Sequence, residues 1–211
     1  MLDLFQTTPY DHLEYPDLAT LCKACTLCSL CETRTQVVVG HGPVPSHVMV
    51  IGEGPGEQED LHGKPFIGKS GQLLTQIFES VGINREEEIY ITNVVKCRPP
   101  ENRAPHPSEI ISCRAYLIRQ IQLVKPKILI LLGAPSLKTV LEEALPISKV
   151  RGQWYKVPTP YMEDPLYIMP MFHPSFLLRN QSKEKGSPKW LTWQDMKEVK
   201  AALDFYKASV S

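Results

Sequence analysis

The sequence predicts an α/β fold, a three-layer α/β/α sandwich in which helices cover both faces of a central, mostly parallel four-stranded sheet. Short apolar runs rich in β-branched residues alternate along the chain with stretches whose apolar residues recur at helical spacing. The runs are apolar throughout, which indicates strands that are covered on both faces. With 211 residues, 43% of them hydrophobic, the chain is long enough for one domain, residues 1–211, with a sizeable core.

Each predicted element follows from such a pattern. The four strands are expected at Val48–Ile51, Ile89–Val95, Ile128–Leu132 and Leu166–Met171. Helices are expected at Tyr15–Leu30, Gly71–Val81, Pro107–Val124 and Thr192–Tyr206, and from Gly133 to about Glu143. Prolines predict ordered loops at Pro99–Pro107 and Val157–Pro165.

The charge balance neither requires nor excludes a nucleic-acid partner. The 23 Lys and Arg residues balance 23 Asp and Glu residues, whereas DNA-binding domains are often basic. Two loops are richer in basic residues, which could form a local patch or an ordinary solvated surface: Lys96, Arg98 and Arg103, then Arg179, Lys183, Lys185 and Lys189. No apolar run approaches the roughly 20 residues that span a bilayer. The N-terminus also lacks a signal-peptide pattern, so we expect a cytoplasmic protein with no membrane partner.

The six cysteines indicate a metal site, because structural disulfides are rare in cytoplasmic proteins. Four of them lie within ten residues, and two follow later: Cys22, Cys25, Cys28 and Cys31, then Cys97 and Cys113. Soft thiolates suit zinc or iron–sulfur sites. The spacing leaves open an alternative in which the four local cysteines bind one metal.

Glycine-rich and polar segments follow three of the predicted strands. The segment Gly52–Glu57 follows the first strand, Asn93 lies near the end of the second, and His173-Pro174-Ser175 follows the fourth. Open parallel sheets bind ligands at the carboxyl ends of their strands. We therefore expect three segments that are distant in the sequence to meet in one crevice.

One segment matches a motif of another function. Gly63–Ser70 fits the nucleotide-binding P-loop pattern G-x-x-x-x-G-K-[ST] and precedes a predicted helix. A P-loop directly follows a buried strand, whereas this segment follows the polar stretch Glu57–His62. A nucleotide hydrolase is therefore kept only as an alternative function.

Several motifs follow one another in a fixed order: Cys25-Thr26-Leu27-Cys28 with Glu32-Thr33-Arg34-Thr35, then Gly52–Asp60, Gly63–Gly68, Ile91–Pro100 with Asn102-Arg103, and His173–Arg179. In this order and spacing they resemble the family 4 uracil-DNA glycosylases, the iron–sulfur branch of that superfamily. The resemblance runs from about Cys25 to Lys200 and is far more specific than any single motif.

The resemblance implies a [4Fe-4S] cluster held by Cys25, Cys28, Cys97 and Cys113. Cys22 and Cys31 depart from the family's pattern, and spare or buried thiols account for them. Such a cluster would tie the N-terminal helix to the loop after Asn93 and to the helix that holds Cys113, which predicts a structural role.

The resemblance also implies the reaction, which is hydrolysis of the N-glycosidic bond between uracil and deoxyribose in DNA. It would release free uracil and leave an abasic site, the first step of base excision repair. The target base must leave the duplex, and the enzyme must stabilise positive charge on the sugar and negative charge on the base. No lysine is expected to be poised for Schiff-base attack, so the strand should stay intact.

The resemblance assigns contacts with uracil to Gly52, Glu53, Gly54, Phe66, Asn93 and His173. Phe66 is expected to stack on the base, while Asn93 accepts from N3–H and donates to O4, a pattern that cytosine reverses. His173 is expected to donate to O2. The catalytic candidates are His173, Glu53 and Glu59, although either carboxylate could instead cap the following loop. A core phenylalanine, a strand-ending asparagine and a structural histidine are the simpler interpretations.

Contacts with single- or double-stranded DNA are expected from Arg98, Asn102, Arg103, Ser175, Leu178 and Arg179. The segment His173–Arg179 is expected to insert at the lesion, as apolar wedges do elsewhere. A monomer is expected. Two other functions stay open besides the hydrolase: a non-catalytic iron–sulfur protein that binds nucleic acid, and a glycosylase of wider base range or with a covalent link to the abasic sugar.

Overall fold

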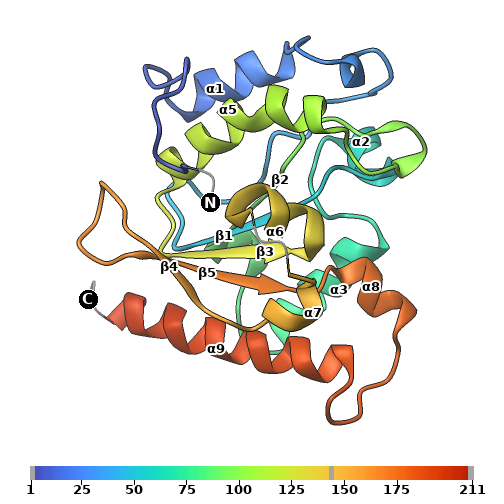
Figure 1. Ribbon diagram of the computed structural model, residues 1–211, viewed down its shortest axis with the longest axis vertical. Coiled ribbons are helices and arrows are strands. Elements are labelled where there is room, and N and C mark those ends of the chain that lie inside the picture. The colour runs from blue at the N-terminus through green and yellow to red at the C-terminus, as the bar shows by residue number, and fades with distance from the viewer. Residues whose placement is uncertain (1–2, 143–144, 209–211) are drawn as a thin grey trace.

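The computed structural model describes residues 3–142 and 145–208 and has a five-stranded sheet at its centre (Figure 1). The strands lie in the order β2-β1-β3-β5-β4, in which the first four are parallel and the edge strand β4 is antiparallel to β5. The strands are β1 (Val48–Gly52), β2 (Ile89–Asn93), β3 (Ile128–Leu132), β4 (Tyr155–Val157) and β5 (Leu166–Met171). The α/β class and the mostly parallel sheet are confirmed. The edge strand β4 was not predicted, because its three residues are too few to show an alternation.

Helices cover both faces of the sheet, with α1, α5 and α6 on one face and α3 and α9 on the other (Figure 1). The helices are α1 (Tyr15–Lys23), α2 (Glu57–His62), α3 (Lys69–Glu79), α4 (Arg85–Glu88), α5 (Pro107–Val124), α6 (Gly133–Leu141), α7 (Ile147–Val150), α8 (Pro174–Arg179) and α9 (Pro188–Ala208). Short 3₁₀ turns occupy Ser29–Cys31 and Pro100–Asn102. Within the described part of the chain, no helix is long and apolar enough to cross a membrane.

The core consists of two apolar layers, one on each face of the sheet. Along β1, Met49 and Ile51 pack into the layer with α1 and α5, whereas Val48 and Val50 pack into the layer with α3 and α9. This is the alternation of a strand, and all five residues of β1 are buried. Burial of each such side chain contributes roughly 1.5–3 kcal/mol, which explains why the strand sequences are apolar throughout.

The N-terminal helix is shorter than predicted, because α1 ends at Lys23 and not at Leu30. Beyond it the chain forms a loop in which Cys28 is extended, and the Ser112 hydroxyl of α5 donates to the Leu27 carbonyl oxygen at 3.3 Å. In a continuous helix, successive cysteines would have been about 4.5 Å apart along the axis, and the four would have wound about half-way around it. The loop instead turns Cys25 and Cys28 toward α5.

The other helix predictions hold to within a few residues. The predicted bounds of α5 are confirmed, α3 lies two residues earlier than predicted, and α9 begins at Pro188, four residues earlier than predicted. Proline suits the first turn of a helix because no N–H donor is needed there. The predicted end of α6, Glu143, lies outside the described residues. The short helices α2, α4, α7 and α8 were not predicted, since four to six residues show too little periodicity.

The carboxyl ends of the parallel strands meet at one edge of the sheet. Gly52 and Asn93 are register partners at the ends of β1 and β2. The second strand ends at Asn93 and not at Val95, since the Val94 and Val95 amides donate to the carbonyls of Gly52 and Glu53. The sheet thus delivers these residues to one crevice.

The P-loop interpretation is wrong. The segment Gly63–Ser70 joins α2 to α3, so a helix and not a strand precedes it. Phe66 within it adopts a left-handed backbone conformation and its ring is buried. The segment therefore positions an aromatic side chain at the carboxyl edge of the sheet.

Candidate active site

A cavity of about 410 Å³ lies at the carboxyl edge of the sheet. Ten predicted site residues line it: Glu53, Gly54, Glu59, Phe66, Asn93, Asn102, Arg103, His173, Ser175 and Arg179. They come from the segments after β1, β2 and β5 and from the loop before α3, so the predicted convergence is confirmed. Three predicted residues, Gly52, Arg98 and Leu178, are not part of the lining.

Phe66 forms one wall of this cavity. Its φ of 53° lies in the left-handed region, which a bulky residue rarely adopts and which costs of order 1–3 kcal/mol. Its ring packs with the apolar layer around α3, and the ring centroid lies 5.8 Å from that of His173. The simple interpretation as a core phenylalanine is therefore incomplete, because the ring also lines the cavity.

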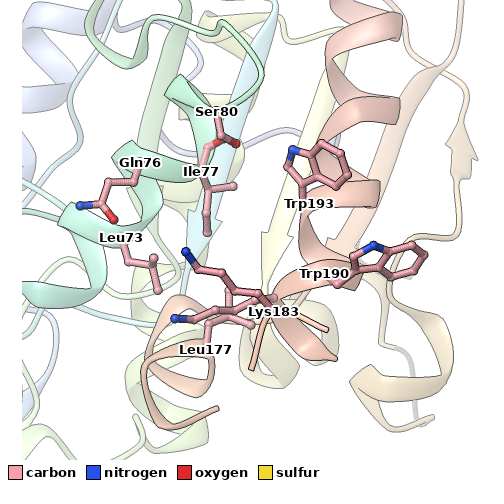
Figure 2. A pocket seen from close by; sticks show the side chains of 9 residues that line it. Leu73, Gln76, Ile77, Ser80, Leu177, Lys183, Trp190 and Trp193 are labelled. Carbon is pink, nitrogen blue, oxygen red and sulfur yellow. The ribbon is translucent and has the colours of Figure 1, made fainter. Parts of the chain in front are cut away.

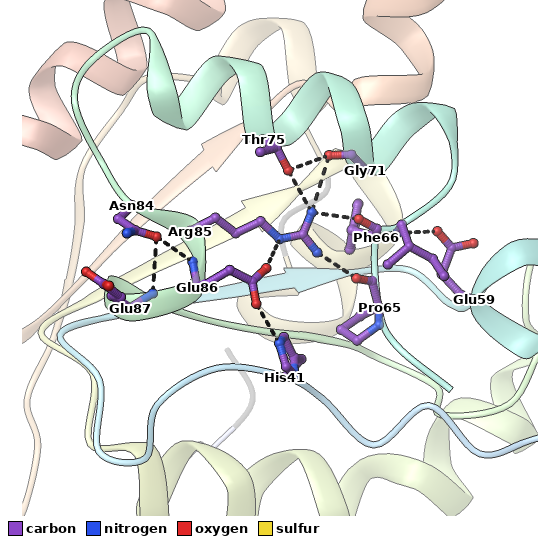
Figure 3. Close-up of polar contacts among 11 residues, drawn as sticks. His41, Glu59, Pro65, Phe66, Gly71, Thr75, Asn84, Arg85, Glu86 and Glu87 are labelled. Carbon is purple, nitrogen blue, oxygen red and sulfur yellow. Dashed lines mark hydrogen bonds and ion pairs between the residues drawn. The ribbon is translucent and has the colours of Figure 1, made fainter. Parts of the chain in front are cut away.

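Arg85 of α4 holds the Phe66 backbone in this conformation. Its guanidinium donates to the carbonyl oxygens of Phe66 and Pro65, each at 2.7 Å, and to the Thr75 hydroxyl at 2.9 Å (Figure 3). Burial lowers the pKa of Arg85. On the other side, a Cβ added to Gly71 would lie 1.8 Å from the Phe66 carbonyl oxygen, so glycine is required where α3 begins.

Glu59 anchors the same loop from inside the cavity. Its Oε1 accepts hydrogen bonds from the backbone amides of Ile67 at 2.8 Å and Gly68 at 2.9 Å. A Cβ on Gly56 would lie 2.8 Å from Oε2, so the glycine leaves room for the carboxylate. The sequence leaves two roles open for Glu59, catalysis and capping of the following loop. The contacts in the structure are those of a cap.

Asn93 lies at the bottom of the cavity, almost fully buried at 1% exposure. Its Oδ1 has no hydrogen-bond partner among the described residues. A Cβ on Gly52 would lie 2.4 Å from this Oδ1 and 2.5 Å from the Phe66 ring. Gly52 therefore permits the close approach of the two side chains, and a buried carbonyl oxygen without a partner is what a ligand N–H would satisfy.

His173 is held in one tautomer by its own helix. As the N-cap residue of α8, it accepts the Ser175 backbone N–H at Nδ1 at 3.1 Å, and the Ser175 hydroxyl lies 2.8 Å from the same atom. Because a backbone amide can only donate, Nδ1 carries no proton, and the proton of the neutral ring is on Nε2. Burial and the nearby Arg179 charge lower the pKa of His173 to about 4. The cavity therefore contains a neutral N–H donor.

Glu53 is the second carboxylate in the cavity wall. It is half-buried, and burial raises its pKa above the usual value of 4.5. Its backbone carbonyl accepts the Val95 amide at 3.1 Å, which fixes the chain beside it. At the adjoining Gly54, a Cβ would lie 2.9 Å from the Val95 side chain. The loop after β1 thus contributes the Glu53 carboxylate and the backbone of Gly54 to the cavity lining.

The loop after β2 is organised by internal contacts. Arg103 forms a two-pronged ion pair with buried Glu109 of α5, at 2.7 and 2.9 Å, and this guanidinium holds the pKa of Glu109 at about 2. Arg98 donates to the Asn102 side-chain oxygen at 2.8 Å. Lys96 is 1% exposed, so it does not belong to the basic surface that the sequence suggested.

Helix α8 carries the remaining predicted contacts. Ser175 and Arg179 line the cavity, and Arg179 is exposed. Leu178 is half-buried and lies outside the lining. The helix thus turns polar side chains toward the cavity.

Five of the cysteines surround a second, much smaller cavity: Cys22, Cys25, Cys28, Cys97 and Cys113. Cys31 is not part of this lining, which argues against the alternative of four local cysteines. All six cysteines are free thiols in this structure. Within the described ranges, no three Cys, His, Asp or Glu side chains stand close enough for a single metal ion. Arg34 donates to the Cys97 sulfur at 3.3 Å, as suits a thiolate.

A buried lysine lies between the two cavities. Lys96 lines the cysteine cavity, and its ammonium donates to the Thr92 hydroxyl at 2.8 Å and to the Asn93 carbonyl oxygen at 2.6 Å. These local hydrogen bonds tie the segment that leads to Cys97 back to the end of β2.

Sequence reasoning missed Arg85 and Ser70. Ser70 lines the cavity, whereas the sequence indicates only its place in a P-loop motif. Arg85 acts across 19 residues of sequence from a short helix, so no local signal pointed to it.

Comparisons with known proteins agree with this geometry. The family model of the uracil DNA glycosylase superfamily matches residues 39–197. The chain is 45% identical to the type-4 uracil-DNA glycosylase of Thermotoga maritima over 163 residues, 77% of this chain and 82% of that protein. It is 39% identical to the type-4 uracil-DNA glycosylase of Saccharolobus solfataricus, over 88% of this chain and 85% of that protein.

A more distant relative is the type-5 uracil-DNA glycosylase of Pyrobaculum aerophilum, 29% identical over 48% of this chain and 50% of that protein. The fold and these matches define an α/β protein of the uracil-DNA glycosylase class. The chain belongs to the uracil DNA glycosylase superfamily and, within it, to the type-4 branch.

Proposed function

We propose that this chain is a monofunctional uracil-DNA glycosylase, which hydrolyses the N-glycosidic bond of deoxyuridine in DNA and releases free uracil. The observation that carries the proposal is the cavity in which Phe66, Asn93 and His173 meet, with the buried Asn93 Oδ1 lacking a partner among the described residues. Its type-4 relatives bear the same activity in their names.

Uracil recognition would rest on three side chains. The base would stack on the Phe66 ring, and the Asn93 amide would accept from N3–H and donate to O4. Cytosine presents the reverse pattern at these two atoms, and an amide held in a fixed orientation would reject it. Gly52 supports this recognition indirectly, by allowing Asn93 and Phe66 to approach each other.

Bond cleavage would rely on charge stabilisation on both sides of the breaking bond. The Nε2–H of neutral His173 would donate to uracil O2 as negative charge develops there. The carboxylate of Glu53 would stabilise the positive sugar or orient the attacking water. Glu59, whose Oε1 accepts two backbone amides, would act by positioning the Phe66 loop.

The strand would remain intact after the base is removed. A Schiff base to the abasic sugar needs an amine nucleophile, and no lysine occurs among the described residues that line the cavity. Hydrolysis by water, with an abasic site as the DNA product, fits this lining.

We propose that the cysteine cavity holds a [4Fe-4S] cluster, with Cys25, Cys28, Cys97 and Cys113 as its ligands. The donor set is suitable, because thiolates are the usual ligands of such clusters and Arg34 supplies a cationic donor to Cys97. When bound, the cluster would supply cross-links between the loop after α1, the loop after β2 and helix α5. Cys22 lines the same cavity and would pack beside the cluster without binding it.

DNA would approach across the mouth of the cavity, from the side of α8 and the loop after β2. Arg179, Ser175 and Asn102 would contact the strand, with Arg98 near the rim. Leu178 would fill the space that the flipped base leaves in a duplex. Arg103 is already paired with Glu109, so its main role would be to hold this loop. We propose a monomer acting on single- or double-stranded DNA.

The test is an excision assay with oligonucleotides that carry one uracil, cytosine or thymine. Purified, cysteine-reduced protein with its cluster is incubated with each, and abasic sites are then cleaved with alkali. Cleavage only at uracil, and only after alkali, is expected. A protein that binds DNA but leaves uracil in place would be the non-catalytic alternative, and strand breaks before alkali would refute the monofunctional mechanism.

A further inference from the structure

A groove of about 510 Å³ lies on the other side of α8 from the uracil cavity. Ile77 of α3 and Trp190 and Trp193 of α9 line it, with Leu177 of α8 and Lys183 between them (Figure 2). The function derived above makes no use of this groove.

The lining combines aromatic surface with positive charge. Trp193 is 41% exposed, although a large aromatic ring normally gains by burial. Lys183 and Lys189 line the groove and, among the described residues, no carboxylate does, in a chain whose net charge is zero. The Lys197 ammonium also lies 4.1 Å from the centre of the Trp193 ring, which adds charge beside the groove. Aromatic rings among lysines are the features with which proteins bind single-stranded nucleic acid.

One short helix, α8, lies between the groove and the proposed DNA-binding face. Leu177 of α8 lines the groove, whereas Ser175 and Arg179 of the same helix line the uracil cavity. The two hollows are therefore separated by about the thickness of a helix, roughly 10 Å. A strand whose uracil occupies the cavity could reach the groove by crossing α8.

We propose that this groove binds unpaired nucleotides that flank the flipped uracil, with bases stacked on the tryptophans and phosphates beside Lys183 and Lys189. The inference rests on the proposed function and extends it to single-stranded DNA as the partner of this second surface. A peptide could also cover an apolar groove, but two lysines and no carboxylate in the described lining favour a polyanion over a peptide of mixed charge.

The first test compares single-stranded oligonucleotides in which unmodified nucleotides on either side of the uracil are added step by step. The KM for uracil excision is expected to fall about tenfold once the added segment reaches the groove, as for the gain of one stacked base. Trp193→Ala and Lys189→Gln should each remove most of this gain. Lys189→Gln should also reduce the salt slope of log KM by about 0.7, the value for one lost phosphate contact on a single strand.

The matched control is Phe205→Ala, which removes an aromatic side chain from an exposed part of the same helix, 67% exposed and outside the groove lining. It should keep the wild-type dependence on length. Intrinsic tryptophan fluorescence gives a second measurement of binding that does not depend on excision. The chain has three tryptophans, and Trp154 packs against Tyr167 beside the core, so unmodified oligothymidine should quench mainly Trp190 and Trp193.

The outcomes separate this inference from the proposed function. A wild-type protein that excises uracil with the same KM at every length, without fluorescence quenching by oligothymidine, overturns the groove but leaves the glycosylase intact. A protein that excises uracil from no substrate overturns the proposed function. Loss of the length dependence in Phe205→Ala as well as in Trp193→Ala would also contradict the groove, because the effect would not be local.

Discussion

The Nη1 atom of Arg85 lies 2.7 Å from the carbonyl oxygen of Phe66, although 19 residues separate them in the sequence. This contact fixes the residue proposed to stack on uracil in a backbone conformation that is unfavourable by itself. The base-binding wall is thus stabilised from α4, outside every segment that the sequence singled out.

Removal of this contact should weaken substrate binding. In Arg85→Met the carbonyl oxygens of Pro65 and Phe66 lose a charged donor, which should reduce stability by about 2–4 kcal/mol. The Phe66 loop should relax, and we expect KM to rise about tenfold, with a smaller change in kcat. Arg119→Met is the matched control, since Arg119 also donates to a backbone carbonyl, that of Leu13, but far from the cavity. If both variants raise KM equally, the positioning role of Arg85 is wrong.

Glu59 offers a test of positioning against catalysis. Glu59→Gln keeps an oxygen that can accept the Ile67 and Gly68 amides, so it should retain most of the excision activity. Glu59→Ala removes this oxygen, and displacement of the loop should lower kcat/KM by roughly a hundredfold. Equal loss in both variants would show that the negative charge itself is needed, as a catalytic role for Glu59 requires.

The pH dependence of excision should reflect Glu53 and not His173. The pKa of His173 is lowered to about 4, so its ring stays neutral as the pH falls from 8 to 5. The pKa of Glu53 is raised above the usual value of 4.5, so its carboxylate becomes protonated at a higher pH than that of an ordinary glutamate. The excision rate should fall as this protonation occurs. Single-turnover rates against pH should therefore show this acidic limb in the wild type and lose it in Glu53→Gln. A limb near pH 6.5 that survives in Glu53→Gln would point to a protonated His173 and contradict the account.

The cysteines should divide into ligands and bystanders. Substitution of Cys25, Cys28, Cys97 or Cys113 by alanine should abolish the visible iron–sulfur absorption and lower the iron content from about four per chain. Cys22→Ala and Cys31→Ala should keep both. Cys22→Ala is the sharper of these two controls, because Cys22 lines the cavity and Cys31 does not. Loss of iron in both Cys22→Ala and Cys31→Ala would favour the alternative in which Cys22, Cys25, Cys28 and Cys31 bind one metal.

The strands and their carboxyl ends could be predicted from the sequence because both follow from local patterns. Runs such as Ile128–Leu132 are apolar throughout, and Asn93 and His173 stand where such runs stop. The position of a residue at the end of a parallel strand then determines which edge of the sheet it occupies. This is why the segments after β1, β2 and β5 could be placed at the cavity in advance, whereas Phe66, Asn102 and Arg179 were named only through the family resemblance.

The supporting contacts could not be predicted, since they depend on packing between distant segments. Nothing near Glu59 in the sequence indicates that it accepts the amides of the Phe66 loop, so the sequence alone does not decide its role. The sequence also did not indicate that Gly52, which was expected to contact uracil, leaves room for the Asn93 side chain. The first helix was also predicted to run to Leu30, whereas α1 ends at Lys23.

The role of Asn93 in reading the base can be tested through the base preference of Asn93→Asp, measured as single-turnover rates on oligonucleotides with uracil or cytosine. A carboxylate only accepts hydrogen bonds, so it cannot donate to uracil O4 but can accept from the exocyclic amine of cytosine. We expect uracil excision to fall by roughly a hundredfold or more, and the ratio of uracil to cytosine excision to fall with it. Uracil excision at the wild-type rate, in a folded variant that retains its iron, would contradict the assignment of Asn93 as the residue that reads the base.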